Sequence, residues 1–99
     1  MIRHIVVFTL TATDAEQRAQ DVEGMRSRLQ ALVGTVPGVH SIVVEPDLGL
    51  IDNHWDVALV SEHDDNAALE AYQAHPQHQQ AAIFISGIVT DRATVDYEF

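Results

Sequence analysis

The stretch AYQAHPQHQQ, residues 71–80, holds the residues whose types and spacing best suit chemistry. Pro76 is favoured at the first position of a helix, which makes His75 the N-cap and His78 the third helical residue. The positive end of the helix macrodipole disfavours protonation, so we expect His78 to stay neutral at pH 7 and to keep the lone pair that a general base needs. Tyr72, one turn upstream, is placed to orient or polarise a substrate oxygen. The same spacing also fits a structural helix junction, in which local capping explains both histidines.

The remaining histidines divide into one candidate and three surface residues. His4 lies on an apolar face of the first predicted strand, where it is either a core histidine satisfied by one hydrogen bond or a pocket residue that polarises a ligand. His40, His54 and His63 fall at predicted strand edges or loops, and we expect them to be solvated. Two histidines three residues apart lack a third ligand nearby, so no metal site is predicted.

The composition excludes several classes of function. The 99 residues contain no cysteine and no lysine, which rules out disulfides, thiolate metal sites, a cysteine nucleophile and Schiff-base chemistry. Five arginines against fifteen acidic residues give a formal charge of −10, which repels nucleic acid and anionic membranes. No glycine-rich phosphate loop is present, and no cofactor is expected. The opening MIRHIVVFTL looks like a strand that begins directly, so a cytoplasmic location is the expectation.

The order of predicted elements is β-α-β-β-α-β, an α+β arrangement of the ferredoxin-like type in a single domain over residues 1–99. Thr13, with Glu16 three residues later, suggests a capping box for a first helix that ends at the breakers GTVPG. A second helix is expected to begin near Asp65, with a further helical piece from Pro76 to about residue 85 or 86. Within the last segment, Asp91 and Arg92 are interpreted as a solvated turn, in which a salt bridge of little energetic weight is possible. The predicted strands are residues 2–10, 39–45, 55–63 and 90–99.

The strands are apolar on both sides, which predicts a partner chain. In the first strand Val6 and Phe8 point to one side, whereas Ile5 and Val7 point to the other. Two helices can cover only one face of a four-stranded sheet, and no residues remain to cover the second. A homodimer that packs sheet against sheet is therefore the expectation; the alternative is a monomer with a moderately apolar exposed sheet.

Five segments together resemble the Dabb family, the stress-responsive dimeric α/β-barrel domain proteins. They are MIRHIVVFTL at the start, VPGVHSIVVEPDL, WDVALVSEHDD, LEAYQAHPQHQQ and the closing DRATVDYEF. The YxxHPxH element and the terminal DY are the most specific of these, and the match covers essentially the whole chain. The resemblance implies a ferredoxin-like protomer whose sheet pairs with that of a second copy to close a dimeric α/β-barrel.

One branch of the family resembles plant polyketide cyclases, which perform an intramolecular aldol condensation without a cofactor. That resemblance implies that His78 is the base, that Tyr72 assists it and that His4 lines the pocket. Leu29 stands where the cyclases have a tyrosine, and Val57 where they have a histidine, so a more apolar pocket is implied here. The expected substrate-binding residues are therefore His4, Leu29, Val57 and His75.

Three functions remain open from the sequence. The first is a cofactor-free enzyme, a cyclase or lyase, in which His78 removes a proton α to a carbonyl. The second is a non-catalytic dimer that binds a small apolar or aromatic molecule or serves as a stress-protective protein. The third is a cofactor-independent monooxygenase, which rests on analogy with similar dimeric barrels alone.

Overall fold

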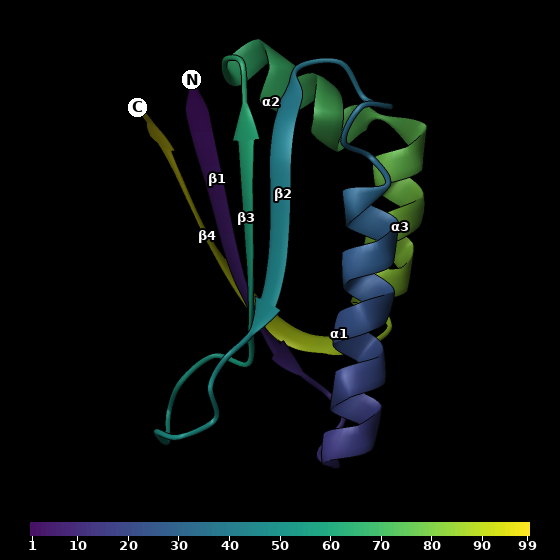
Figure 1. Cartoon of the computed structure of the whole chain (residues 1–99), viewed down its shortest axis with the longest axis vertical. Helices are drawn as coiled ribbons and strands as arrows, with labels where there is room; N and C mark the ends of the chain where they lie inside the picture. Colours follow the sequence, from purple (N-terminus) through teal and green to yellow (C-terminus); the bar gives the residue numbers. More distant parts are fainter.

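A computed structural model describes all of residues 1–99 as one sheet with helices against it (Figure 1). The chain ends meet at one end of the sheet, where the amino group of Met1 donates to the backbone oxygen of Phe99 at 3.0 Å. The elements are β1 (Ile2–Leu10), α1 (Ala15–Gln30), β2 (Val39–Pro46), β3 (Val57–His63), α2 (Asn66–Ala74), α3 (Pro76–Ser86) and β4 (Val89–Glu98).

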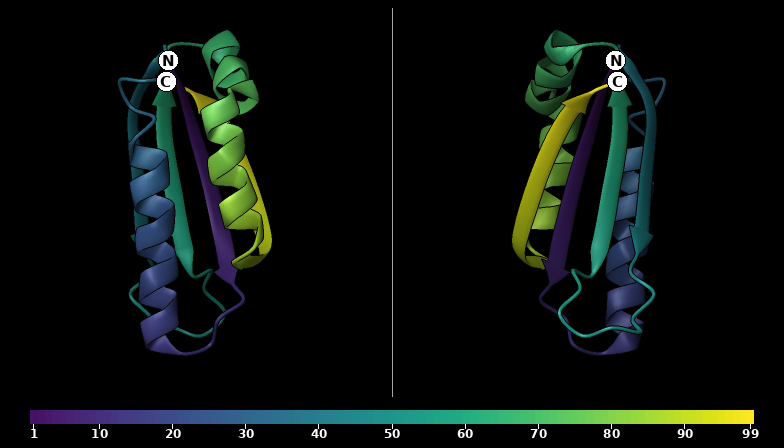
Figure 2. Two further views of the ribbon diagram at one scale, coloured as in Figure 1. Left: turned by 90° about the vertical axis from the view of Figure 1, so that its right-hand side faces the viewer. Right: turned by 90° about the vertical axis from the view of Figure 1, so that its left-hand side faces the viewer.

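The sheet has the strand order β2-β3-β1-β4, and every neighbouring pair is antiparallel. All three helices cover one face of this sheet, whereas the other face carries none (Figures 1 and 2). This is the ferredoxin-like α+β arrangement that the element order predicted, so the predicted fold class is confirmed.

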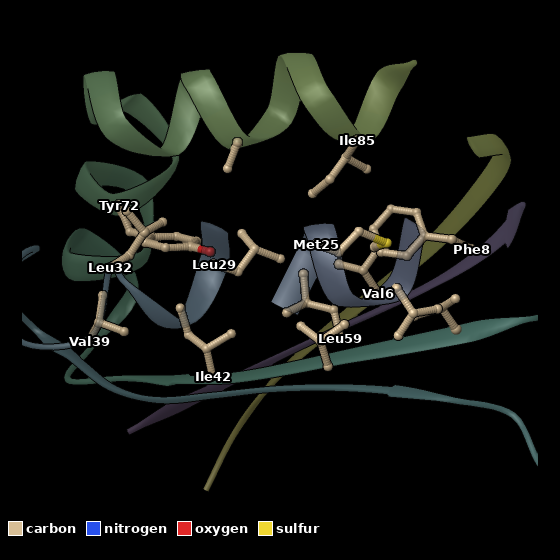
Figure 3. Close-up of a cluster of buried hydrophobic side chains, with 14 of the residues drawn as sticks. Val6, Phe8, Met25, Leu29, Leu32, Val39, Ile42, Leu59, Tyr72 and Ile85 are labelled. Atoms are coloured by element: carbon tan, nitrogen blue, oxygen red, sulfur yellow. The ribbon is translucent and has the colours of Figure 1, made fainter. Parts of the chain in front are cut away.

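The hydrophobic core lies between the sheet and the helices (Figure 3). Alternate residues of β1 and β3 point into it because successive side chains of a strand face opposite sides. The helices contribute an apolar stripe from α1 and two buried residues each from α2 and α3. The largest members of the core include Phe8, Met25, Leu29, Leu59, Leu69, Tyr72 and Ile85.

The uncovered face of the sheet carries an apolar row that crosses all four strands. Val43 pairs with Val60, Val60 with Ile5, and Ile5 with Val95, so these side chains share one face. The two end members are widely exposed, Val43 at 48% and Val95 at 62%. The expectation that the strands are apolar on both faces is therefore confirmed in the first and third strands and extends to the other two.

The first helix begins and ends differently from the prediction. Asp14, and not Thr13, is the N-cap, and its carboxylate accepts a hydrogen bond from the Gln17 backbone N–H at 3.0 Å. Aspartate caps as well as threonine does, and here it stands one residue closer to the helix. The helix ends at Gln30, and the residues up to the breakers form turns.

Two strand boundaries also differ from the prediction. The third strand begins at Val57 rather than at residue 55, because Asp56 turns towards the end of β1, where its carboxylate accepts from the Leu10 N–H at 2.8 Å. The solvated turn expected at Asp91 and Arg92 is part of β4, which begins at Val89 and pairs both residues with β1. The two side chains form no salt bridge with each other, because consecutive strand residues point to opposite faces.

Candidate functional site

The junction between α2 and α3 sets a phenol against an imidazole. His75 has extended backbone (φ −66°, ψ 135°), ends α2 and N-caps α3, and its Nδ1 accepts from the Gln77 N–H at 3.1 Å. Pro76 and His78 occupy the first and third helical positions, as the spacing predicted. Tyr72 lies in the last turn of α2, and its ring centroid is 4.5 Å from that of His78.

These two rings belong to a chain of four aromatic side chains that enters the core. The ring of Tyr72 is 4.8 Å from that of His63, which is 6.3 Å from that of His4. His63 is completely buried, so the expectation that it is solvated was wrong. It continues the helix-facing side of β3 through Leu59 and Ser61, and its Nε2 is 2.8 Å from the Ser61 hydroxyl.

The two other histidines expected at the surface are exposed. The side chain of His40 is 48% accessible and pairs with Asp64, whereas that of His54 is 46% accessible and pairs with Asp47 at 3.1 Å. Ion pairs at this exposure contribute little to stability, and both lie outside the aromatic chain.

Three polar atoms in the aromatic chain are buried without a hydrogen-bond partner in the protein: Tyr72 Oη, His78 Nδ1 and His63 Nδ1. A buried polar group that lacks a partner costs about 1–3 kcal/mol. Such groups are rare in folded proteins, and here all three sit on consecutive rings. The arrangement is typical of a site whose polar groups are satisfied by a ligand.

A cavity of about 150 Å³ adjoins this cluster between the sheet and α1 and α3. Its polar lining includes His4, His78 and Arg92. The apolar lining comes mainly from Val6, Phe8, Leu29, Leu59, Ile85 and Val89. The cavity therefore combines a mainly apolar lining with a few polar groups, which is the usual make-up of a small-molecule site.

The cavity brings together three of the six residues predicted for the site, namely His4, Leu29 and His78. Tyr72 does not line it but lies behind His78 in ring contact. Val57 is buried in the core, only 2% exposed, and lines a different hollow, below the loop that joins β2 to β3. His75 is held at the helix junction by its capping role and also stands outside the cavity.

His4 is held by a carboxylate on the neighbouring strand. Asp96 is its direct partner in the β1–β4 register, and the His4 Nδ1 is 2.5 Å from the Asp96 Oδ1. The prediction that His4 points inward is confirmed, since the residue is 4% exposed. A carboxylate at Nδ1 fixes the orientation of the ring and leaves Nε2 as the nitrogen that can meet a ligand.

Burial sets the protonation of the cluster. It lowers the pKa of His78 below the usual 6.5; a hydrogen bond with the Gln73 backbone opposes this shift, and the positive charge of Arg92 adds to it. The direction agrees with the predicted neutral imidazole, although the largest cause is burial and not the helix macrodipole. Burial also lowers the pKa of His63 to about 4 and raises the pKa of Tyr72 to about 12. At neutral pH His78 and His63 are therefore uncharged and Tyr72 keeps its proton.

A larger hollow, of about 400 Å³, lies between α1 and the ends of β1 and β2. Its polar groups already serve one another: Arg18 pairs with Asp56 at 3.2 Å, and Asp56 also caps the Leu10 N–H. It therefore offers a ligand less than the aromatic cluster does. No group of three or more His, Asp or Glu side chains converges as a metal site, and no helix has the length and apolar character needed to cross a membrane.

The sequence matches the Stress responsive A/B Barrel Domain, Dabb, over residues 2–99. The chain belongs to the Dabb family. The resemblance seen in the YxxHPxH element and the terminal DY is thereby confirmed. No curated protein sequence matches the chain.

Solved structures of similar proteins share the whole Dabb fold of this chain. A dimeric protein of unknown function with a ferredoxin-like fold from Bacteroides fragilis is 28% identical, with a TM-score of 0.88 and coverage of 99% of this chain and 95% of that one. A dimeric ferredoxin-like protein of unknown function from Thermobifida fusca is 30% identical, with a TM-score of 0.83 and coverage of 99% and 90%. An antibiotic biosynthesis monooxygenase is 15% identical over 100% and 98%, with a TM-score of 0.76, which shows a shared fold.

Sequence patterns did not identify three residues that the structure places at the site. His63 carried a usable signal, because it stands two residues after Ser61 and four after Leu59 on one side of a strand. Asp96 and Arg92 carried none, since only the β1–β4 register brings them next to His4 and Phe8. That register joins the two ends of the chain and cannot be read from local spacing.

Proposed function

We propose that this Dabb protein is a cofactor-free enzyme in which His78 removes a proton α to a carbonyl group. The neutral imidazole accepts the proton, the electron pair of the C–H bond passes into the carbonyl group, and an enolate forms. Attack of the enolate carbon on a second carbonyl of the same substrate would close a ring, the aldol chemistry of polyketide cyclases. The observation that carries this proposal is the pair of unpartnered groups, Tyr72 Oη and His78 Nδ1, on rings 4.5 Å apart beside an apolar cavity.

The electrostatics of the cluster support this assignment. A base with a lowered pKa is unprotonated at neutral pH, and a phenol with a pKa of about 12 keeps its proton, so Tyr72 remains a hydrogen-bond donor beside His78. His4, oriented by Asp96, provides a second polar contact to the substrate. General-base catalysis of this kind contributes about 10²- to 10⁴-fold to a rate.

Hydrogen–deuterium exchange tests the base without knowledge of the natural substrate. Small methyl ketones in deuterated buffer should exchange their α-protons faster with the protein than without it, as followed by NMR. The variant His78→Ala should lose this acceleration, whereas His54→Gln, which changes an exposed histidine outside the cluster, should keep it. Exchange that persists in His78→Ala would show that another group is the base.

The proposal includes a homodimer that closes over the uncovered face of the sheet. It is supported by the apolar row from Val43 to Val95 and by the dimeric state of the Bacteroides fragilis and Thermobifida fusca relatives. Monomers rarely expose an apolar face of this extent. Sedimentation should give about twice the mass of the 10.9-kDa chain, and Val95→Asp should shift the mass towards that of one chain. A single-chain mass for the unaltered protein would contradict the dimer.

A protein that binds a small molecule without changing it is the second candidate, because a bound ligand alone would account for the polar groups His4, His78 and Arg92 that line the apolar cavity. Ketones that bind at the cavity yet exchange no faster than in buffer would favour it. A cofactor-independent monooxygenase has only the shared fold in its support. Oxygen consumption with a polycyclic phenol tests that activity directly.

A further inference from the structure

Arg92 brings a positive charge to the cavity from β4. It pairs with Phe8 across β1 and β4, so its side chain lies on the helix-facing side of the sheet, as His4 and Asp96 do four residues along. Arg92 lines the same cavity as His78. The edge strand therefore contributes a guanidinium to a site that is otherwise mostly apolar.

This guanidinium has no partner in the protein, which sets it apart from the other four arginines. Arg3 bonds to Glu62 and Tyr97, and Arg18 to Asp56. Arg26 bonds to two glutamates, and Arg28 bonds to a backbone oxygen and stacks on Phe84. The side chain of Arg92 makes no hydrogen bond, ion pair or ring contact.

The isolation of Arg92 is notable in so acidic a chain. Fifteen Asp and Glu side chains are present, yet none of the salt bridges in the structure involves Arg92. The nearest acidic residues in β4 are engaged elsewhere, because Asp96 is bonded to His4 and Asp91 accepts the Arg92 backbone N–H at 2.8 Å. A cation that is left free while its neighbours are paired is available to an anion from solution.

We infer that the cavity takes a small carbonyl compound that also carries a carboxylate, a keto acid, and that Arg92 binds this carboxylate. The inference rests on the proposed function of the cavity and names its substrate class. The carboxylate would accept paired hydrogen bonds from the guanidinium, while the carbonyl end meets His78. A volume of about 150 Å³ suits a short carbon skeleton, since clefts for drug-sized ligands measure about 300–1,000 Å³.

The negative overall charge of the protein separates this inference from general electrostatic attraction. At a formal charge of −10 the molecule as a whole repels anions, so general electrostatics predict a preference for a neutral ligand. A preference for the anion must then come from a local cation. Because Arg92 is exposed, we expect a gain of about tenfold in affinity, the lower range for a charge-assisted pair, and a smaller gain at high salt.

The test compares two ligands of nearly equal shape, 4-oxopentanoate and 4-oxopentanamide, which differ in charge. Binding to the full-length protein is measured by NMR titration, with Arg92→Gln, Arg92→Lys and Arg28→Gln as variants. The unaltered protein and Arg28→Gln should bind the anion about tenfold more tightly than the amide. Arg92→Gln should bind both equally or prefer the amide, and Arg92→Lys should keep part of the preference for the anion.

Equal binding of the two ligands by the unaltered protein, a preference for the anion that survives Arg92→Gln, or no binding of either in the millimolar range would overturn the inference. The α-proton exchange of the bound ligand is followed in the same samples. Selective binding of the anion without exchange would leave Arg92 as the carboxylate site and refute the base. Exchange without a preference for the anion would support His78 as the base and refute Arg92 as the carboxylate site, so the two failures are distinguishable.

Discussion

The buried phenol of Tyr72 yields a prediction in which stability and activity change in opposite directions. The residue is completely inaccessible, and its oxygen has no hydrogen-bond partner within the chain. Replacement by phenylalanine keeps the ring against His63 and His78 and removes only the unpaired hydroxyl. The ligand-free protein should therefore become more stable, although the hydroxyl serves the proposed chemistry.

The size of the effect follows from the cost of burial. A buried hydroxyl without a partner costs about 1–3 kcal/mol, and partial relaxation around it leaves a gain of about 1 kcal/mol for Tyr72→Phe. With a denaturant dependence of about 1–3 kcal/mol per molar urea, the midpoint of unfolding should rise by about 0.5 M. The same variant should slow α-proton exchange, because the hydrogen-bond donor beside His78 is lost.

Urea denaturation at one protein concentration, followed by circular dichroism, measures the change. Tyr97→Phe is the matched control, because Tyr97 is 41% exposed and its hydroxyl accepts a hydrogen bond from Arg3 at 2.6 Å. That variant loses a bond and should be neutral or slightly less stable. A fall in stability of Tyr72→Phe by more than about 1 kcal/mol would show that the hydroxyl is well satisfied in the resting protein, and would remove the main support for a ligand-binding role.

Two further predictions concern the helix packing and the acid sensitivity of the fold. A methyl group on Gly24 would lie 2.5 Å from the Phe84 ring, so Gly24→Ala should destabilise the protein by about 1–3 kcal/mol. In a Phe84→Ala background this clash is absent, and the same change should stabilise the protein because alanine has the higher helix propensity. Thermal unfolding of the four proteins checks this, and a stabilising Gly24→Ala alone would contradict the contact. Burial lowers the pKa of His63 to about 4, so the unfolded chain, with a value of 6.5, binds the proton more readily. The contribution of His63 to the free energy of unfolding should be fully present above pH 6.5 and be lost as the pH falls towards 4. In denaturation experiments at a series of pH values, His63→Gln should lose less stability on acidification than His54→Gln.

Local patterns in the sequence were sufficient for the fold. Alternation in β1 and β3, the stripe from Val22 to Leu32 and the proline at the start of α3 each have a short-range physical cause. The cap at Asp14 instead of Thr13 shows the limit of such patterns, because adjacent residues with similar propensities compete within one turn.

The site was only half predictable for a different reason. Residue type and position in a helix or strand were enough to predict His78, Tyr72 and His4. Asp96 and Arg92 enter the site only through pairing between strands at opposite ends of the chain. Val57 was expected in the pocket, but Val89 lines the cavity instead, since β4 and not the loop that precedes β3 contributes to its wall.

The state of one imidazole tests the central claim most directly. An NMR titration of the His78 ring in the intact protein, assigned by comparison with His78→Ala, reports its pKa. The burial of the ring beside the cavity predicts a pKa below the usual 6.5 and slow exchange of the ring N–H proton with water. A pKa at or above 6.5, with a ring N–H proton that exchanges rapidly with bulk water, would contradict the account.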